Sequence, residues 1–241
     1  MALAALVMCA VVVRLGFWQI DRLAQRHAES GRRTERLFAA PVRLDTAGTP
    51  VGAGPDALRL FQPVVVRGTF DSGQQLGVTN EIWDGKLGIH LLTPLVLEGG
   101  KAVLVDRGWV PAAPDQPVEW ERYRVEGALE VTGWVRPIAK ANGLLSPATA
   151  APRSDPARLV PALDTRAIQG RVTYALLPFV VTEYPPAGER VSEAALPYRR
   201  LPETDLGDGV HVIAAAQWFV IGGIIVVGQV AYVRRQMMRG T

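Results

Sequence analysis

The sequence predicts a membrane protein in which two transmembrane α-helices flank a β-rich domain. A 24-residue stretch near the C-terminus, Val210–Val233, contains no charged side chain, and the first 13 residues are also apolar. Between these ends lie short runs of β-branched and aromatic residues that are separated by Gly, Pro and Asn. Such runs, without long helices between them, are typical of an antiparallel sheet or a barrel-like domain.

Composition supports a folded chain with a neutral central domain. Of the 241 residues, 49% are hydrophobic and 20% are charged, which excludes a disordered protein. Four of the 26 basic residues lie in the two ends and none of the 23 acidic residues does, so the 189 residues between them carry a net charge of −1. No basic patch indicates nucleic-acid binding. The single cysteine, Cys9, excludes a disulfide framework.

Residues 1–20 are predicted to form the first transmembrane helix. Met1–Val13 is apolar but covers only about 20 Å as a helix, less than the ~30 Å hydrocarbon core. Either the sequence begins inside the span, or the span includes Arg14, whose side chain extends to the headgroups. A cleaved signal peptide is disfavoured, because the segment has neither a basic start nor an Ala-x-Ala site.

Residues 21–209 are predicted to form the β-rich domain with a leading amphipathic helix. This helix, Asp21–Phe38, continues out of the membrane and has Leu23, Leu37 and Phe38 as its apolar contacts. Gly143–Pro161 is rich in Ala, Pro and Ser and is interpreted as a surface excursion. The predicted strands are Phe61–Phe70, Gln74–Thr79, Leu87–Leu97, Ala102–Val110, Arg124–Val135 and Val172–Glu183. The hairpin breaks are expected at 71–73, 80–85 and 98–100.

Residues 210–233 are predicted to form the second transmembrane helix and residues 234–241 a basic tail. A helix of this length spans about 36 Å and ends at Arg234-Arg235. Counting arginines beside the two spans would put the central domain in the cytoplasm, but that rule is weak for long loops. Charge alone therefore leaves the orientation open.

Catalytic chemistry is not indicated by the sequence. It contains no Gly-x-Ser-x-Gly, no P-loop, no dinucleotide fingerprint and no paired histidine ligands. Asp106 and Arg107 are neighbours in a predicted strand, so they point to opposite faces of it. His90 lies in an apolar run and is interpreted as a strand histidine on the less buried face. Nothing here predicts hydrolysis or group transfer.

Five pieces of sequence together resemble one known family. They are Leu15–Gln19 with Arg22, Arg67–Phe70, Gly88 with Leu92–Leu95, Val103–Pro111, and His211 ahead of Gln217–Phe219. The chain resembles the Surfeit locus protein 1 family of cytochrome c oxidase assembly factors. The resemblance is nearly end to end and is thinnest over residues 140–200.

The resemblance implies a multi-pass protein of the inner (cytoplasmic) membrane, with its β-rich domain outside the cytoplasm and its tail, 234–241, inside. It also implies binding of haem a and assistance in its delivery or insertion into the catalytic subunit of cytochrome c oxidase, with haem A synthase as a further partner. The protein would not be an enzyme. In the family a histidine near the start of the second span is implicated in haem binding, and the matching residue is His211.

Physical chemistry supports His211 as a candidate ligand of the haem iron. A neutral imidazole can ligate this iron, and a histidine at membrane depth is a functional candidate. Ala214 and Ala215 leave the adjoining helix face without bulk, and Trp218 returns to it two turns later. Two departures from the family are Ala214, where an aromatic residue is common, and Arg14, where an apolar one is expected. The alternative is a histidine hydrated at the headgroups.

Two further residues, Gln217 and Arg107, are candidates for binding haem. Gln217, in mid-span, is expected to bind haem or to hydrogen-bond another helix. Gly222 and Gly223 permit close helix approach, and Gly16 allows the two spans to pack near Trp18.

Arg107 has two interpretations. In the first, Arg107-Gly108-Trp109 is architectural, with Trp109 in the core and a bulge at Gly108. In the second, the Arg107 guanidinium pairs with haem propionates or with an acidic partner. Arg199 and Arg200 are equally placed for that second role.

Three other function classes compete with haem handling. The first is a membrane-anchored scaffold that binds oxidase subunits or haem A synthase and never contacts haem. The second is an anchored enzyme of unknown reaction, which the absence of a nucleophile–base pair or a metal cluster disfavours. The third is copper delivery, which is disfavoured because Cys9 lies in the membrane and the domain has no Met or His cluster.

Overall fold

A computed structural model describes residues 2–52, 58–112, 117–138, 155, 157–168, 170–185, 196–202 and 209–239. The chain divides into two compact units. Residues 1–34 and 203–241 form a helical unit, and residues 35–202 form a β unit.

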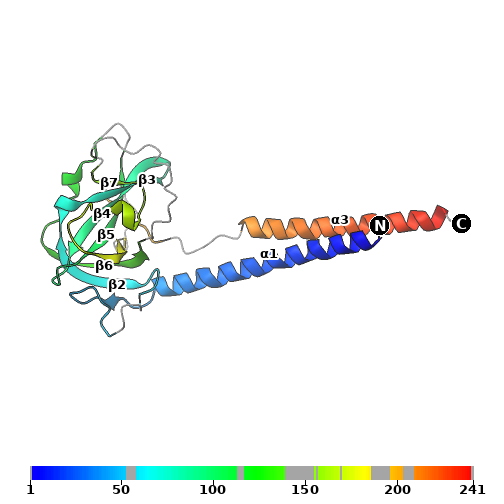
Figure 1. The fold of residues 1–241 in the computed structure, drawn as a ribbon, viewed down its shortest axis with the longest axis horizontal. Helices are drawn as coiled ribbons and strands as arrows, with labels where there is room; N and C mark the ends of the chain where they lie inside the picture. The colour runs from blue at the N-terminus through cyan, green and yellow to red at the C-terminus, as the bar shows by residue number, and fades with distance from the viewer. Residues whose placement is uncertain are drawn as a thin grey trace. The chain divides into compact units, whose positions relative to one another are not determined.

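The β unit is a sheet that closes on itself, which confirms the predicted barrel-like domain. Its strands lie in the order β1-β2-β6-β8-β5-β4-β3-β7, and a further pairing joins β2 to β4 (Figure 1). Strands β2, β6, β8, β5 and β4 therefore form a closed ring. The strands are β1 (Val42–Arg43), β2 (Pro63–Phe70), β3 (Leu76–Trp83), β4 (Lys86–Val96), β5 (Ala102–Pro111), β6 (Ala128–Pro137), β7 (Leu159–Val160) and β8 (Leu176–Glu183).

The sheet is mixed rather than purely antiparallel. β5 pairs with β8 in parallel, as β1 does with β2 and β3 with β7. β8 lies between β6, to which it is antiparallel, and β5. The last long strand of the unit therefore completes the ring from the middle of the sheet, a position that strand spacing along the sequence does not indicate.

β5 is the most deeply buried of the long strands, with every residue except Pro111 buried. Val103 and Val105 pack in the largest apolar cluster, while Leu104 packs in a different one, as the alternation of side chains along a strand requires. Both faces of β5 are therefore covered by protein.

Two predictions about loops are corrected. The expected break over residues 80–85 is shorter, because β3 continues to Trp83 through an irregularity after Val78. The turn itself is Asp84-Gly85, whose φ angles of 48° and 72° match a type I′ hairpin. The predicted surface excursion, Gly143–Pro161, is wrong at its C-terminal end, because Leu159 and Val160 are buried and pair with β3 as strand β7. Residues 143–154 of that segment lie outside the described part of the chain.

Helix α1 (Ala2–Leu37) is continuous, as expected for a helix that extends beyond the predicted first span. Its last residue, Leu37, is buried beside Trp134 and Phe61. The Tyr184 hydroxyl donates a hydrogen bond of 2.9 Å to the Leu37 carbonyl, which satisfies a helix-terminal acceptor. Phe38 was expected to make an apolar contact, but its side chain is 69% exposed because the helix ends one residue earlier.

The predicted bulge at Gly108 is confirmed. Between the pairs His90–Trp109 and Leu92–Asp106, β5 contains one residue more than β4. Gly108 takes a φ of +116°, which L side chains rarely adopt, and a Cβ there would lie 2.4 Å from the Tyr198 carbonyl oxygen. Trp109, two per cent exposed, is in the core as predicted.

We therefore predict that Gly108→Ala lowers the free energy of unfolding by about 2–3 kcal/mol, because it adds a steric clash to backbone strain. Gly85→Ala is the matched control, since Gly85 also has a positive φ but a Cβ there would have no other atom within 4 Å; it should cost about 1 kcal/mol. Urea unfolding of the two variants measures the difference. Equal losses would show that the Tyr198 contact is unimportant.

Candidate functional site

Helix α3 (Gly209–Arg239) contains three of the four predicted site residues. Among the described residues, one helical segment, Ala216–Arg239, is long and apolar enough to cross a membrane, and an 18-residue window within it has a mean hydropathy of 1.7. This segment overlaps most of the predicted span at 210–233, and the helix continues past Arg234 and Arg235 to Arg239. The first span, residues 1–20, stays a prediction.

The helix backbone places His211 and Trp218 on one face. Successive residues are about 100° apart, so seven residues bring Trp218 to within about 20° of His211. Gln217 lies about 120° from His211 on the same geometry. The Trp218 side chain is half-buried and that of Gln217 is exposed, while the His211 side chain lies outside the described part of the chain.

The two long helices pack through small residues. A Cβ at Gly16 would lie 2.7 Å from the Phe219 ring, so the glycine makes room for that ring. Phe219 also packs edge-on against Phe17, with ring centroids 5.7 Å apart. Gly222 faces Val12. The predicted role of Gly16 and Gly222 in close approach is confirmed, whereas Gly223 has no neighbour within 4 Å and Trp18 is 51% exposed.

Arg107 belongs to the β unit and is 5% exposed. Its guanidinium donates to the Tyr123 carbonyl and lies 5.6 Å from the centre of the Phe70 ring. Burial and the neighbouring Arg199 lower the pKa of Arg107, an effect that Glu183 opposes. These contacts favour the architectural interpretation of Arg107.

Arg199 and Arg200 lie in the segment 196–202, and each has a partner within the β unit. Arg199 forms an ion pair of 2.6 Å with Glu183, and its Nε donates to the Arg107 carbonyl. Burial raises the pKa of Glu183, although Arg199 and Arg107 oppose the shift. Arg200 lies 4.9 Å from the centre of the Trp83 ring.

Tyr198 anchors the same segment to the barrel. Its ring stacks on Trp109 and on Trp83, with centroid distances of 5.6 and 6.1 Å. Its backbone exchanges two hydrogen bonds with Trp109, of 2.7 and 2.9 Å. The segment 196–202 therefore covers β5 at Trp109.

A cluster that the sequence did not predict surrounds Asp106, which is fully buried. The Nδ1 atom of His90 lies 3.0 Å from both Asp106 carboxylate oxygens, and Arg136 donates to the same carboxylate at 2.8 Å. The Gly108 amide donates a fourth contact at 3.1 Å. His90 is a strand residue on the less buried face, as predicted, since its side chain is 22% exposed between the fully buried Ile89 and Leu91; it is also a partner of a buried charge. Asp106 and Arg107 have separate partners, as their opposite orientations predict.

Neighbouring groups favour the charged forms of Asp106 and His90. Burial alone would raise the pKa of Asp106, but His90, Arg136 and the Gly108 amide lower it below its ordinary value of 3.8. Burial alone would lower the pKa of His90, but Asp106 and, more weakly, Glu81 raise it above 6.5. No group of three or more His, Cys, Asp or Glu side chains suited to a metal ion occurs among the described residues, and this cluster offers only two such groups.

The His90–Asp106 pair predicts a pH dependence of stability. Because the folded state raises the His90 pKa, the bound proton stabilises the fold fully below about pH 6.5 and this contribution is lost as the pH rises through the folded-state pKa. We expect the free energy of unfolding, measured in urea at a series of pH values, to fall over that range. His90→Gln should flatten the profile, and His27→Gln should not. An unchanged profile in His90→Gln would contradict the assignment.

The buried position of Arg107 predicts a structural loss on substitution. Arg107→Met should lower the free energy of unfolding by about 2–3 kcal/mol, because the buried Tyr123 carbonyl loses its charged donor. Arg67→Met, at an exposed position of β2, should change it by less than about 0.5 kcal/mol. Thermal unfolding of both variants tests this. A stable Arg107→Met protein would favour the ligand-binding interpretation instead.

The family model and the relatives that this chain resembles all carry the SURF1 or Surfeit locus protein 1 name. A family model described as the SURF1 family matches residues 6–223. A SURF1-like protein from Monosiga brevicollis is 31% identical over 137 residues, covering 52% of this chain and 51% of that protein. Surfeit locus protein 1 from Homo sapiens is 29% identical over 140 residues, covering 51% and 44%. A SURF1-like protein from Dictyostelium discoideum is 25% identical over 133 residues, covering 54% and 47%.

The alignments to these relatives are partial, and the chain spans about half the length of the relatives that it matches. The family model is more extensive, since it covers most of α1, all strands of the barrel and the part of α3 that contains His211, Gln217 and Trp218. On that match, this chain belongs to the SURF1 family.

Proposed function

We propose that this protein is an assembly factor for the haem–copper cytochrome c oxidase, and that it binds haem a and assists its delivery or insertion into the catalytic subunit. Family membership carries the proposal, because the match extends over residues 6–223 and includes His211. The role follows from the resemblance to Surfeit locus protein 1. The protein acts on haem as cargo and catalyses no reaction.

His211 is the proposed ligand of the haem iron, through a neutral imidazole. Trp218 lies within about 20° of it on α3 and forms one wall of the site. Ala214 and Ala215, one turn from His211, add no bulk on which a flat macrocycle would clash. Gln217, about 120° away, supports the site from a neighbouring face of the helix. Arg107 is proposed to act through the fold, since its guanidinium is already bound to the Tyr123 carbonyl.

The membrane arrangement is part of the proposal. The apolar segment of α3 supports one span, and residues 1–20 of α1 are proposed as the second. The β unit lies outside the cytoplasm in this arrangement, with residues 234–241 inside, in the inner membrane of the cell. The catalytic subunit of the oxidase and haem A synthase are the proposed partners.

A scaffold that binds oxidase subunits or haem A synthase without contacting haem is the second candidate. The observation that favours it is Gln217, whose side chain is exposed on a stretch of α3 that has no other charged or amide side chain before Gln229. An amide at membrane depth is stabilised by a hydrogen bond to another helix, and a partner subunit would provide one.

The absorption spectrum of the purified protein distinguishes the two candidates. The full chain is isolated in mild detergent from cells that make haem A, as the wild type, as His211→Leu and as His27→Leu. We expect a haem a band in the wild type that falls by about tenfold or more in His211→Leu, the scale typical of disrupting a metal site. His27→Leu, which removes a histidine of α1, should keep the band.

The other outcomes are equally informative. An equal band in all three proteins would overturn His211 as the ligand while keeping the cargo. Three colourless preparations, with folding verified by circular dichroism, would overturn haem binding and favour the scaffold.

A further inference from the structure

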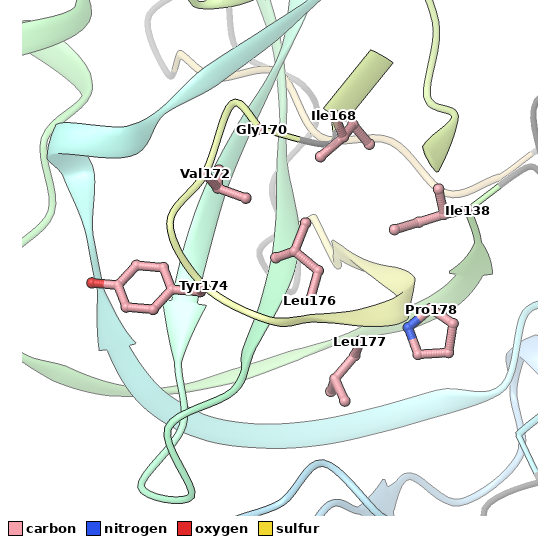
Figure 2. Close-up of a pocket in the computed structure, with 8 residues that line it drawn as sticks. All are labelled: Ile138, Ile168, Gly170, Val172, Tyr174, Leu176, Leu177 and Pro178. Carbon is pink, nitrogen blue, oxygen red and sulfur yellow. The ribbon is translucent and has the colours of Figure 1, made fainter. Parts of the chain in front are cut away.

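An apolar pocket of about 320 Å³ lies in the β unit. Figure 2 shows the apolar side chains that line it converging on one space, while the Tyr174 ring is directed away from them and its hydroxyl binds Asp71. None of the described residues that line this pocket is charged. Apolar surface without a convergent polar group does not define a ligand. Helix α3 differs, because its exposed apolar face contains one amide.

This exposed face of α3 lies opposite the face that packs on α1. Gly222 is buried and faces Val12 of α1. Trp218, Ile225 and Gln229 lie on the same side of the helix as Gly222 and are half-buried. On the opposite side, residues follow one another at alternating spacings of four and three. We call these six residues the α3 stripe: Ile213, Gln217, Val220, Ile224, Val227 and Ala231.

All six residues of the α3 stripe are exposed. Its four β-branched members have exposed fractions of 61–69%, the highest of any large apolar residue described between positions 210 and 233. Helix α1 therefore leaves this face uncovered. An apolar repeat at spacings of four and three is the pattern by which parallel helices pack side by side.

Gln217 adds a polar group to the α3 stripe. It lies about 11 Å from the start of the predicted span, and its side chain is exposed. At membrane depth an amide is stabilised by a hydrogen bond to another helix, which lipid chains cannot provide. Because the amide has both donors and an acceptor, two Gln217 side chains can exchange hydrogen bonds across a two-fold axis.

We propose that two copies of this chain associate in the membrane through the α3 stripe. Both copies insert with the same orientation, so their α3 helices are parallel and the two Gln217 side chains meet at the same depth. A second copy therefore always presents a matching amide at this depth, whereas a different subunit need not. The α3 stripe ends at Ala231, before Arg234, so the like charges of the two tails lie among the headgroups, where salt screens them. The proposal rests on the α3 span of the proposed function and does not depend on haem.

Disulfide cross-linking in native membranes tests the pairing. The full chain carries Cys9→Ser and one new cysteine, as Val220→Cys, Ile224→Cys or Val227→Cys, and two differently tagged copies are expressed together in cells that make no haem A. We expect copper phenanthroline to give a product that contains both tags. Val226→Cys is the matched control, because it is exposed at the same depth but lies about 100° around the helix from Val227. It should cross-link about tenfold less.

The contribution of the amide is measured in the Ile224→Cys protein. Gln217→Leu should lower cross-linking about tenfold, towards the upper end of the range measured for hydrogen bonds between membrane helices. Gln217→Asn keeps an amide and should lower it less than twofold. Gln229→Leu is the matched control, since it removes the other amide of the span from the side that faces α1, and it should leave cross-linking unchanged.

Three results would overturn the proposal. Equal cross-linking at Val226 and at the α3 stripe would show random collision, and an undiminished product in Gln217→Leu would remove the amide from the contact. A product that contains a different protein and no second copy would assign the α3 stripe to a partner subunit. Because these cells make no haem A, the outcome is independent of the haem a spectrum, and the two proposals fail separately.

Discussion

The burial of β5 on both faces is the constraint on which the rest of the β unit depends. A strand with water on neither side must find protein partners for every polar group that it carries. β5 carries two adjacent charges, Asp106 and Arg107, and because neighbouring side chains of a strand point to opposite faces, each charge has its own surroundings. The carboxylate then meets His90 and Arg136 from the neighbouring β4 and the nearby β6, while the guanidinium meets the Tyr123 carbonyl and the Phe70 ring.

Local chemistry in the sequence predicted much of this fold. All six expected strands overlap long strands over most of their expected length, because β-branched runs end where Gly, Pro or Asn permit turns. The bulge at Gly108 and the burial of Trp109 were also predicted from local sequence. A glycine next to a large aromatic residue in a strand indicates an irregular backbone. The close approach of the two helices at Gly16 was predicted from residue size, whereas its partner there, Phe219, was not.

Long-range pairing was not predictable from those signals. His90 and Asp106 are 16 residues apart, and they meet because β4 and β5 pair in antiparallel with Leu92 opposite Asp106, which places His90 diagonally across from the carboxylate. β7 has two residues and lies in an Ala- and Pro-rich stretch, so no periodicity distinguishes it. Within the candidate haem site, helical periodicity placed His211 beside Trp218, but the second wall of such a site would come from groups that one helix does not supply.

The position of β8 has a consequence for the order in which the protein forms during synthesis. β8 is the last of the strands that the structure describes along the chain, yet it lies between β6 and β5 in the closed ring. The residues before Leu176 therefore leave a gap between those two strands, with apolar edges and unpaired backbone groups. Closure must wait until Glu183 has left the ribosome, long after the residues of α1 have emerged. The nascent domain thus passes through a stage at which the barrel is still open between β5 and β6. At that stage a chaperone, or a strand from another chain, can bind the exposed strand edges in place of β8.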